Sequence, residues 1–194
     1  MHKFSGFVCA LFVALAVTAA HAEPVLHGPG NPDALGTFQL LPDTPGQEIE
    51  IFVRPDENLT PDAGELADDE VQGVNLNLQI GDGGRGAGGS VDGPEITGVD
   101  LFSGTIFEGN NTGQGSANGV LVPQVAFFST TTGSGTVKAD GLLATVTIDT
   151  TGFSPEDGPF DLVLSQTVNN PTNFGPVNPE VTDGTLAIVP EPTS

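Results

Sequence analysis

The chain has 194 residues and is strongly acidic, with 25 aspartate and glutamate residues against 4 lysine and arginine residues and a formal net charge of −21. It contains no tryptophan, no tyrosine and one cysteine. A surface with so few cations repels phosphate backbones and anionic lipid, so the composition excludes nucleic acid and anionic membrane surfaces as partners. The length suits one domain with a sizeable core.

Residues 1–22 have the pattern of a cleavable signal peptide. His2 and Lys3 precede an apolar run over 7–17, and Ala20-His21-Ala22 supplies the small-x-small cleavage site. The run is shorter than the about 20 residues that span a bilayer, which favours cleavage over a membrane helix. Because no second apolar run of spanning length follows, we expect an exported protein without a stable membrane span.

Cleavage after Ala22 also removes reactive side chains. The mature chain has no cysteine and one histidine, His27, and its only cations are Arg54, Arg85 and Lys138. Ser-His-Asp and Cys-His catalysis both need a histidine or cysteine in the folded body. The sequence therefore predicts a protein that is not an enzyme. A glycosidase with two carboxylates is the remaining alternative, although the chain lacks the tryptophan and tyrosine that commonly stack on sugars.

The first part of the mature chain predicts a lead-in and two strands. Residues 23–36 are rich in proline and glycine and predict a flexible lead-in. A strand is predicted over 37–41, and the alternation in Glu48–Val53 predicts another, with its apolar residues on one face. Residues 54–70 then predict an acidic loop broken by prolines.

The clearest strand pattern covers residues 74–80. Valine, leucine and isoleucine take one face, and Asn75, Asn77 and Gln79 take the other. Since an antiparallel sheet can leave one face in solvent, this polar row is a candidate binding face. An ordinary solvated sheet face is the alternative interpretation of the same pattern.

The rest of the chain repeats short alternating runs between turn-forming residues. Two loops, 81–89 and 109–119, are rich in glycine or polar residues. Further strands are predicted within 96–107, 120–130, 140–149, 159–164 and 183–189. About eight or nine short strands without a convincing helical period predict an all-β fold, an antiparallel β-sandwich over residues 37–189.

Acidic residues gather where calcium could bind, because Ca²⁺ takes about six to eight oxygen ligands. Asp68, Asp69 and Glu70 in the predicted acidic loop are the candidate ligands, and Asp82 and Asp92 flank the glycine-rich loop. None of these acids has the EF-hand spacing, so solvated loop charge is the alternative. Calcium is the one cofactor that the sequence leaves open.

The order of the strands resembles the cohesin-like group of β-sandwiches, relatives of the cellulose-binding-module fold. The resemblance lies in Glu48–Val53, in Val71–Leu78, and in two later strands, Asp140–Ile148 and Val181–Leu186. It covers about residues 36–189 and is specific over 140–189. It implies a jelly-roll sandwich that acts as a non-enzymatic protein-binding or carbohydrate-linked surface module. The implied partner is usually a calcium-loaded dockerin; the alternative is a carbohydrate-binding module of an extracellular polysaccharide-related system.

The final residues 190–194 resemble the start of a PEP-CTERM sorting signal. The resemblance rests on Pro190, Glu191 and Pro192, directly after the last predicted strand. Such a signal normally continues into an apolar helix and a basic cluster. Together with the signal peptide, this stub leads us to expect an extracellular or cell-surface protein of a bacterium.

Overall fold

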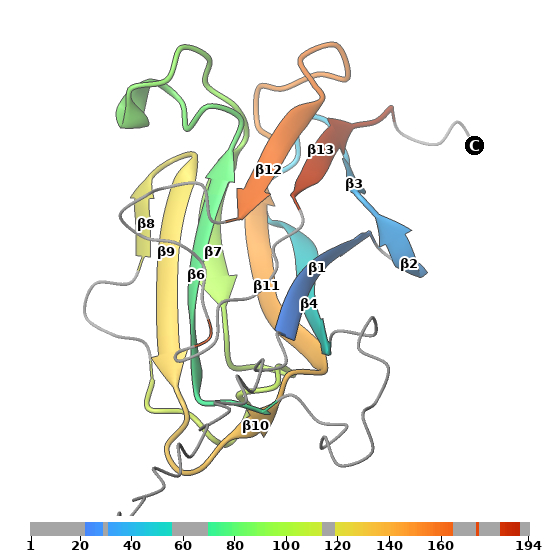
Figure 1. Cartoon of the computed structure of the whole chain (residues 1–194). Helices are drawn as coiled ribbons and strands as arrows, with labels where there is room; N and C mark the ends of the chain where they lie inside the picture. The colour runs from blue at the N-terminus through green and yellow to red at the C-terminus, as the bar shows by residue number, and fades with distance from the viewer. Residues whose placement is uncertain are drawn as a thin grey trace, which may run out of the picture.

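The computed structural model describes residues 22–28, 31–55, 70–113, 119–164, 174 and 183–190. These ranges form strands and one short 3-10 helix, η1 (Arg85–Ala87). Nowhere in them is there a helix with the length and apolar character needed to cross a membrane. The predicted all-β class is confirmed: two large sheets lie face to face as a sandwich (Figure 1).

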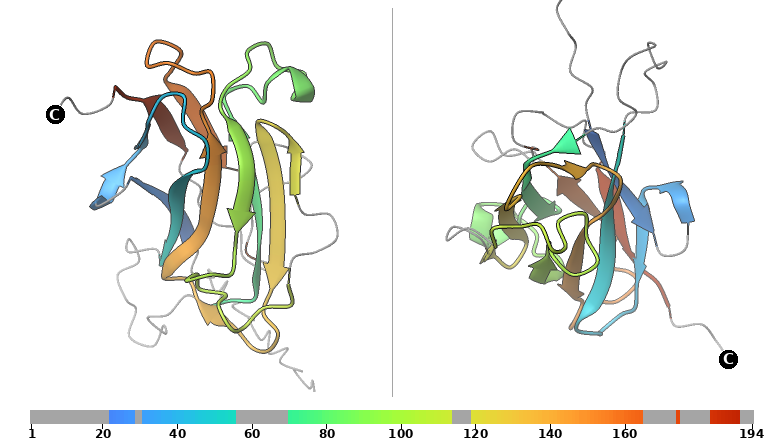
Figure 2. Two further views of the ribbon diagram at one scale, coloured as in Figure 1. Left: turned by 180° about the vertical axis from the view of Figure 1, so that it is seen from behind. Right: turned by 90° about the horizontal axis from the view of Figure 1, so that it is seen from below.

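The first sheet, called sheet A here, has five strands in the order β2-β1-β4-β11-β7, and all neighbours are antiparallel. It lies in front in the left view of Figure 2. Its strands are β1 (Ala22–Gly28), β2 (Asn31–Leu35), β4 (Gln47–Pro55), β7 (Glu95–Asp100) and β11 (Gly141–Asp149).

The second sheet, sheet B, has six strands in the order β3-β13-β12-β6-β9-β8 and faces the viewer in Figure 1. Its strands are β3 (Thr37–Leu40), β6 (Gly73–Ile80), β8 (Gly119–Val122), β9 (Val125–Thr131), β12 (Phe160–Leu164) and β13 (Gly184–Ile188). A separate pair joins β5 (Glu70–Val71) to β10 (Val137–Lys138). The prediction of antiparallel pairing is wrong for one contact, because β13 runs parallel to β3.

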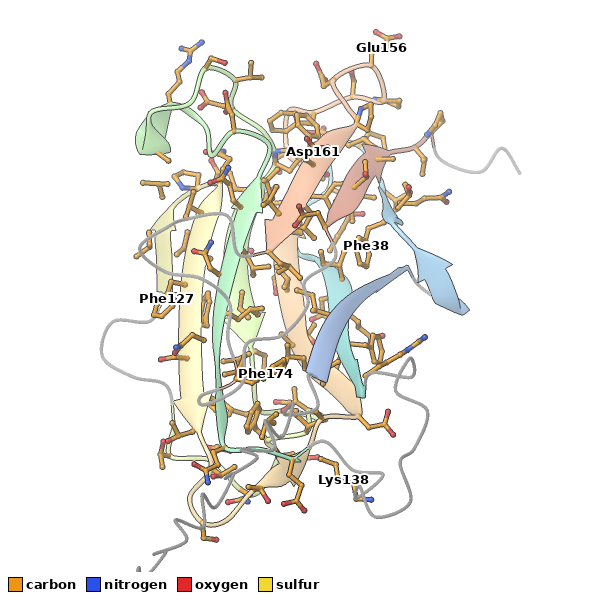
Figure 3. The ribbon with its side chains drawn as sticks, in the orientation of Figure 1. Phe38, Phe127, Lys138, Glu156, Asp161 and Phe174 are labelled. Atoms are coloured by element: carbon orange, nitrogen blue, oxygen red, sulfur yellow. The ribbon has the colours of Figure 1, made fainter. Side chains whose placement is uncertain are left out.

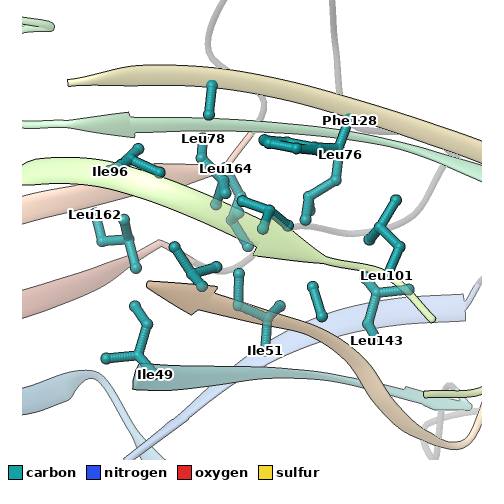
Figure 4. Packing of buried hydrophobic residues seen from close by; sticks show 14 of the residues in the cluster. Ile49, Ile51, Leu76, Leu78, Ile96, Leu101, Phe128, Leu143, Leu162 and Leu164 are labelled. Atoms are coloured by element: carbon teal, nitrogen blue, oxygen red, sulfur yellow. The ribbon is translucent and has the colours of Figure 1, made fainter. Parts of the chain in front are cut away.

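The core lies between the two sheets, and about every second residue of most strands points into it. Sheet A contributes residues such as Ile49 and Ile51, and sheet B contributes Leu76 and Leu78; all four are at most 2% exposed (Figure 4). Removing such a side chain from water contributes about 1.5–3 kcal/mol. Phe174 is fully buried and belongs to the same core cluster. The period-two pattern of the sequence is thus the pattern of burial.

Two predicted strand regions end earlier or divide. The region predicted over 96–107 is a strand only to Asp100, whose Oδ1 accepts hydrogen bonds from the backbone N–H of Phe102 (2.7 Å) and Ser103 (3.1 Å) and so turns the chain. The region predicted over 120–130 divides into β8 and β9 at Pro123, whose ring fixes φ and removes a donor.

The predicted lead-in also differs from the structure. Most of residues 23–36 lies in β1 and β2, and β1 pairs with β4 from Ala22 opposite Pro55 to His27 opposite Glu50. Proline and glycine in this stretch obscured the strand pattern at the sequence level. The first strand therefore begins at Ala22, the last residue of the predicted signal peptide.

Candidate binding surfaces

The predicted polar row lies on the outer face of sheet B, as its alternation indicates. Pairing with β9 places Asn75 beside Ser129 and Asn77 beside Phe127. Asn75 is half-buried, but Asn77 is only 2% exposed, so the expectation of a fully solvated row is wrong at its centre. The half-buried Gln79 donates a hydrogen bond from Nε2 to the Gly81 carbonyl (3.0 Å). A binding role for this row stays a prediction.

Exposed apolar side chains gather at the edge of the same sheet. Val120 and Leu121 on edge strand β8 are 39% and 57% exposed. Beside them on β9 the ring of Phe127 is half-buried, and its partner in the ladder is Gly119, which has no side chain to cover it (Figure 3). We call Leu121 and Phe127 the edge patch, because Val120 pairs with the buried Ala126 and so points to the core side of the sheet. Sequence reasoning missed it because valine and phenylalanine in an alternating run indicate core by default.

The glycine-rich loop stands next to the edge patch. A Cβ atom added to Gly86 would lie 3.1 Å from Cβ of Val122, so the loop packs directly on β8. The loop also carries Val91, whose side chain is 63% exposed. Three of the four large apolar side chains exposed in the described ranges therefore belong to β8 or to the loop that contacts it.

Asp82 holds the glycine-rich loop in shape. Its Oδ1 accepts a hydrogen bond from the Gly84 N–H (3.1 Å), and its Oδ2 accepts from the N–H (2.6 Å) and hydroxyl (2.8 Å) of Ser90. The hydrogen bonds from Ser90 are the main reason why the pKa of Asp82 lies below its ordinary value of 3.8. The carboxylate therefore already has backbone and hydroxyl partners without a metal ion.

Two further side chains fix the end of this loop. Asp92 accepts a hydrogen bond from the Arg85 N–H (2.9 Å), and its other oxygen lies 3.7 Å from Arg85 Nε. Gln124, which is 4% exposed, donates from Nε2 to the Gly93 carbonyl (2.8 Å). The loop thus presents a defined surface beside β8.

The predicted calcium ligands are only partly covered by the structure. Asp68 and Asp69 lie outside the described residues. Glu70 is exposed at the start of β5, where it pairs with Lys138 in the ladder and accepts a hydrogen bond from the Thr136 hydroxyl (2.5 Å). Within the described ranges no three acidic or histidine side chains form a group that could hold a metal ion. Calcium binding by Asp68, Asp69 and Glu70 stays a prediction.

The outer face of sheet A carries carboxylates instead of apolar groups. These lie on the three neighbouring strands β4, β11 and β7, and we call them the acid face: Glu48, Glu50, Glu95, Asp100 and Asp149. The three glutamates are exposed, and the two aspartates are half-buried. The sequence did not reveal this surface, because pairing between strands far apart in the chain assembles it.

Only the first residue of the predicted sorting motif is described. Val189 continues the β13 ladder by donating its N–H to the Leu40 carbonyl (2.8 Å), and Pro190 follows with an exposed side chain. Glu191 and Pro192 lie outside the described residues. A sorting role for the motif stays a prediction.

No protein-family model and no curated protein matches the chain. Among solved structures, it is similar to a non-cellulosomal cohesin from the hyperthermophilic archaeon Archaeoglobus fulgidus, with 16% identity, a TM-score of 0.48, and coverage of 88% of this chain and 92% of the other. It is also similar to the cohesin module of a family 33 glycoside hydrolase from Clostridium perfringens, with 10% identity, a TM-score of 0.45, and coverage of 89% and 98%. Both of these solved structures are cohesins.

Proposed function

We propose that the chain is an exported, non-enzymatic recognition or scaffolding module at a bacterial cell surface, and that a protein partner docks on its edge patch. The observation that supports this most is the exposure of Leu121 on β8 (57%) next to the half-buried Phe127 on β9. Exposed apolar residues that adjoin one another mark interaction sites more often than isolated ones do. Leu121 is already partly buried, so covering its exposed part would contribute about 1 kcal/mol to binding, before the cost of association.

The chemistry around the edge patch supports the same proposal. The outward residues next to it on β6 and β9 are uncharged: Asn75, Gln79 and Ser129. Centres of protein interfaces are depleted in charge, whereas polar groups surround them. In so acidic a chain, an apolar patch whose neighbours on β6 and β9 are uncharged is a distinct local environment.

The backbone of β8 favours docking through side chains over the addition of a strand. The strand has only four residues, its pairing with β9 shifts between Val120 and Val122, and Pro123 follows it. Short length, irregular register and proline are devices by which edge strands avoid pairing with other chains. The proposed partner therefore contacts Leu121 and Phe127 rather than extending the sheet.

A dockerin is the partner that the cohesin-like resemblance implies, and it provides the test. We expect a calcium-loaded dockerin module to bind the full chain, and Leu121→Asp to weaken binding by about tenfold or more by placing a charge in the apolar contact. Leu41→Asp is the matched control, because Leu41 is also exposed (38%) but lies after β3. Isothermal titration with calcium and with a chelator measures both variants.

The outcomes separate clearly. Loss of binding in Leu121→Asp, with Leu41→Asp close to the parent, supports docking on the edge patch. Equal loss in both variants, or no dockerin binding with or without calcium, would contradict the proposal. Circular dichroism melting of each variant shows that both remain folded, as expected for exposed positions.

A polysaccharide is the second candidate ligand, and Phe127 is the observation that favours it. Its half-buried ring faces a glycine in the ladder, and the half-buried amides of Asn75 and Gln79, a kind of group that can bond sugar hydroxyls, lie diagonally across the β6–β9 ladder. Affinity electrophoresis on a polysaccharide panel tests this function. Retardation that disappears in Phe127→Ala supports a carbohydrate-binding module, and migration unaffected by every polysaccharide rules it out.

For the location, we propose that the Pro190-Glu191-Pro192 motif acts in sorting. Pro190 is exposed where the chain leaves β13, as a processing signal requires. Expression of the full chain in a bacterium that sorts such proteins should place it at the cell surface, and replacement of the three motif residues by alanine should prevent this. Unchanged surface display of that variant would contradict the proposal.

A further inference from the structure

A cleft lies on the outer face of sheet B, at the opposite edge from β8. Its volume is about 320 Å³. Strands β3 and β13 and the loop that leads into β12 line it, with the residues Thr37, Thr185, Ala187, Pro155, Gly158 and Pro159. Ligand sites in proteins have volumes of about 300–1,000 Å³, so this cleft has room for one side chain rather than for a large molecule.

The loop that forms the wall of the cleft is held by its own contacts. Ser154 donates from its N–H (2.7 Å) and its hydroxyl (2.8 Å) to Asp157 Oδ2. These bonds lower the pKa of Asp157 from its ordinary value of 3.8, and they occupy this carboxylate within the loop. The ring of Phe153 packs edge-on against Phe160, with 5.8 Å between the centroids, and the Phe153 carbonyl accepts from the Asp43 N–H (3.1 Å). Because the wall is formed before a ligand arrives, the entropic cost of binding is lower.

Three polar side chains form one row across the floor and the rim of the cleft. Thr37 lies beside Thr185 in the parallel β3–β13 pair, and Asp161 lies opposite Thr185 in the antiparallel β12–β13 pair (Figure 3). Neighbouring strands are about 4.8 Å apart, so the row extends over about 10 Å. Thr185 is half-buried, whereas Thr37 and Asp161 are exposed. The register of the strands thus places a carboxylate directly beside two hydroxyl groups.

The side chains of this row have no structural role that explains them. Within the ranges that the structure describes, neither the two hydroxyls nor the Asp161 carboxylate forms a side-chain hydrogen bond or an ion pair. The hydroxyls of Thr44 and Thr150, by contrast, donate to backbone carbonyls (both 2.7 Å). The row therefore offers three acceptor groups, one of them charged, to a ligand in the cleft.

The apolar and polar parts of the cleft match the two parts of an arginine side chain. Pro155, Pro159 and Ala187 provide an apolar surface for the methylene stem, and the charged head then reaches the rim. The guanidinium carries five N–H donors in a planar fork, so it bonds a carboxylate through two of them and has others for hydroxyl groups. A lysine ammonium holds its three donors at one point and matches a row of acceptors less well.

We propose that the cleft binds one arginine side chain of a protein partner, with its guanidinium paired to Asp161 and bonded to the hydroxyls of Thr185 and Thr37. The net charge of −21 favours a cationic group over an anionic one and disfavours a second copy of this chain as the partner. The cleft and the edge patch lie at opposite edges of sheet B, so this proposal does not rest on docking at the edge patch (Figure 1).

N-acetyl-arginine amide is the probe, and NMR shifts of backbone amides in the full chain measure its binding. We expect saturable shifts at Thr185 and Ala187, with a dissociation constant on the order of 1 mM for so small a ligand. Asp161→Asn should weaken binding by about tenfold, because it removes the charge of the acceptor. Thr185→Val removes one hydroxyl and should weaken binding by about threefold. The matched control Glu108→Gln removes one charge at an exposed position outside the cleft and should change the affinity by less than about twofold.

Two further probes test the chemistry of the ligand, and thermal melting shows that each variant is folded. N-acetyl-citrulline amide has the shape of the arginine probe without its charge, and we expect it to bind at least about tenfold more weakly. N-acetyl-lysine amide should bind about threefold more weakly. Binding of either probe as tight as that of arginine would overturn the proposal.

The variants and the free protein give the other decisive outcomes. Equal weakening in Asp161→Asn and Glu108→Gln would mean that net charge alone attracts the probe, and it would overturn the proposal, as would the absence of saturable shifts. Shifts of the same amides that depend on protein concentration alone would identify a second copy as the occupant, which also contradicts it. Leu121→Asp should leave probe binding unchanged, so failure at the cleft and failure at the edge patch can be recognised separately.

Discussion

The two outer faces of the sandwich differ although the same alternation builds both. On sheet B the outward residues of β6 and β9 are amides, a serine and a phenylalanine beside the apolar edge patch. On sheet A the outward residues of β4, β11 and β7 are mainly glutamates, aspartates and threonines, with Phe52 and Arg54 towards the end of β4. Inner positions on both sheets are alike, since both bury aliphatic side chains. The fold therefore constrains the inner positions and leaves the chemistry of the outer positions free to differ.

The largest expected effect is the difference between a substitution at an inner position and one at an outer position of the same strand. Ile51 is fully buried and Glu50 beside it is exposed. We expect Ile51→Ala to lower the free energy of unfolding by about 2–5 kcal/mol, because it leaves a cavity in the core. Glu50→Ala should change it by less than about 0.5 kcal/mol. Urea denaturation of both variants checks the contrast, and a comparable loss in both would mean that the acid face has a structural role.

A second expected effect, loss of stability together with displacement of a loop, should be confined to sheet B, which carries the edge patch. Gly84 has φ 67°, and an added Cβ would lie 2.3 Å from Gln124 Oε1, so Gly84→Ala should lower stability by about 1–3 kcal/mol and displace the loop beside β8. Gly88 has φ 89° but no atom within 4 Å of an added Cβ. Gly88→Ala should therefore show only the backbone strain, about 1 kcal/mol.

A binding measurement shows whether this second effect reaches the edge patch. Gly84→Ala should weaken dockerin binding, because the loop packs on Val122, whereas Gly88→Ala should leave it close to that of the parent. Isothermal titration of both variants checks this, and equal binding by both would indicate that the loop does not support the edge patch.

The strands could be predicted from the sequence because their signal is local. The alternation in 48–53, 74–80 and 140–149 is visible within a few residues, and all three regions are strands. Strand ends that depend on a turn were less accessible, as at Asp100. The strands β1 and β2 were not predicted, because their stability comes from pairing with β4 and with each other rather than from residue type.

The surfaces were harder to predict because they depend on contacts distant in sequence. Asn77 alternates like its neighbours Asn75 and Gln79, yet it is buried, and nothing in the local pattern distinguishes it. The acid face combines β4, β7 and β11, whose neighbourhood is a property of the fold. Valine and leucine on β8 fit the sequence pattern of core residues, and they are exposed because β8 lies at the edge of sheet B.

The smallest expected effect concerns the like charges on the acid face. Glu95→Gln removes one charge of the pair with Asp149, so it should raise the free energy of unfolding by about 0.2–1 kcal/mol at low salt. Added salt screens the repulsion, so the gain should shrink as ionic strength rises. Glu156→Gln, at an exposed loop position, should show neither the gain nor its salt dependence.

The pH dependence of stability provides a further check on the repulsion between Glu95 and Asp149. Hydrogen bonds from the hydroxyl and N–H of Thr151 lower the pKa of Asp149 from its ordinary value of 3.8, so this carboxylate stays charged in the folded protein below that pH. The lowered pKa stabilises the fold above the unfolded-state pKa, and this contribution is lost as pH falls through the folded-state value. The gain from Glu95→Gln should disappear once acid has protonated Asp149. A gain that persists in acid or at high salt would have to come from packing, and like-charge repulsion between Glu95 and Asp149 would then be ruled out as its cause.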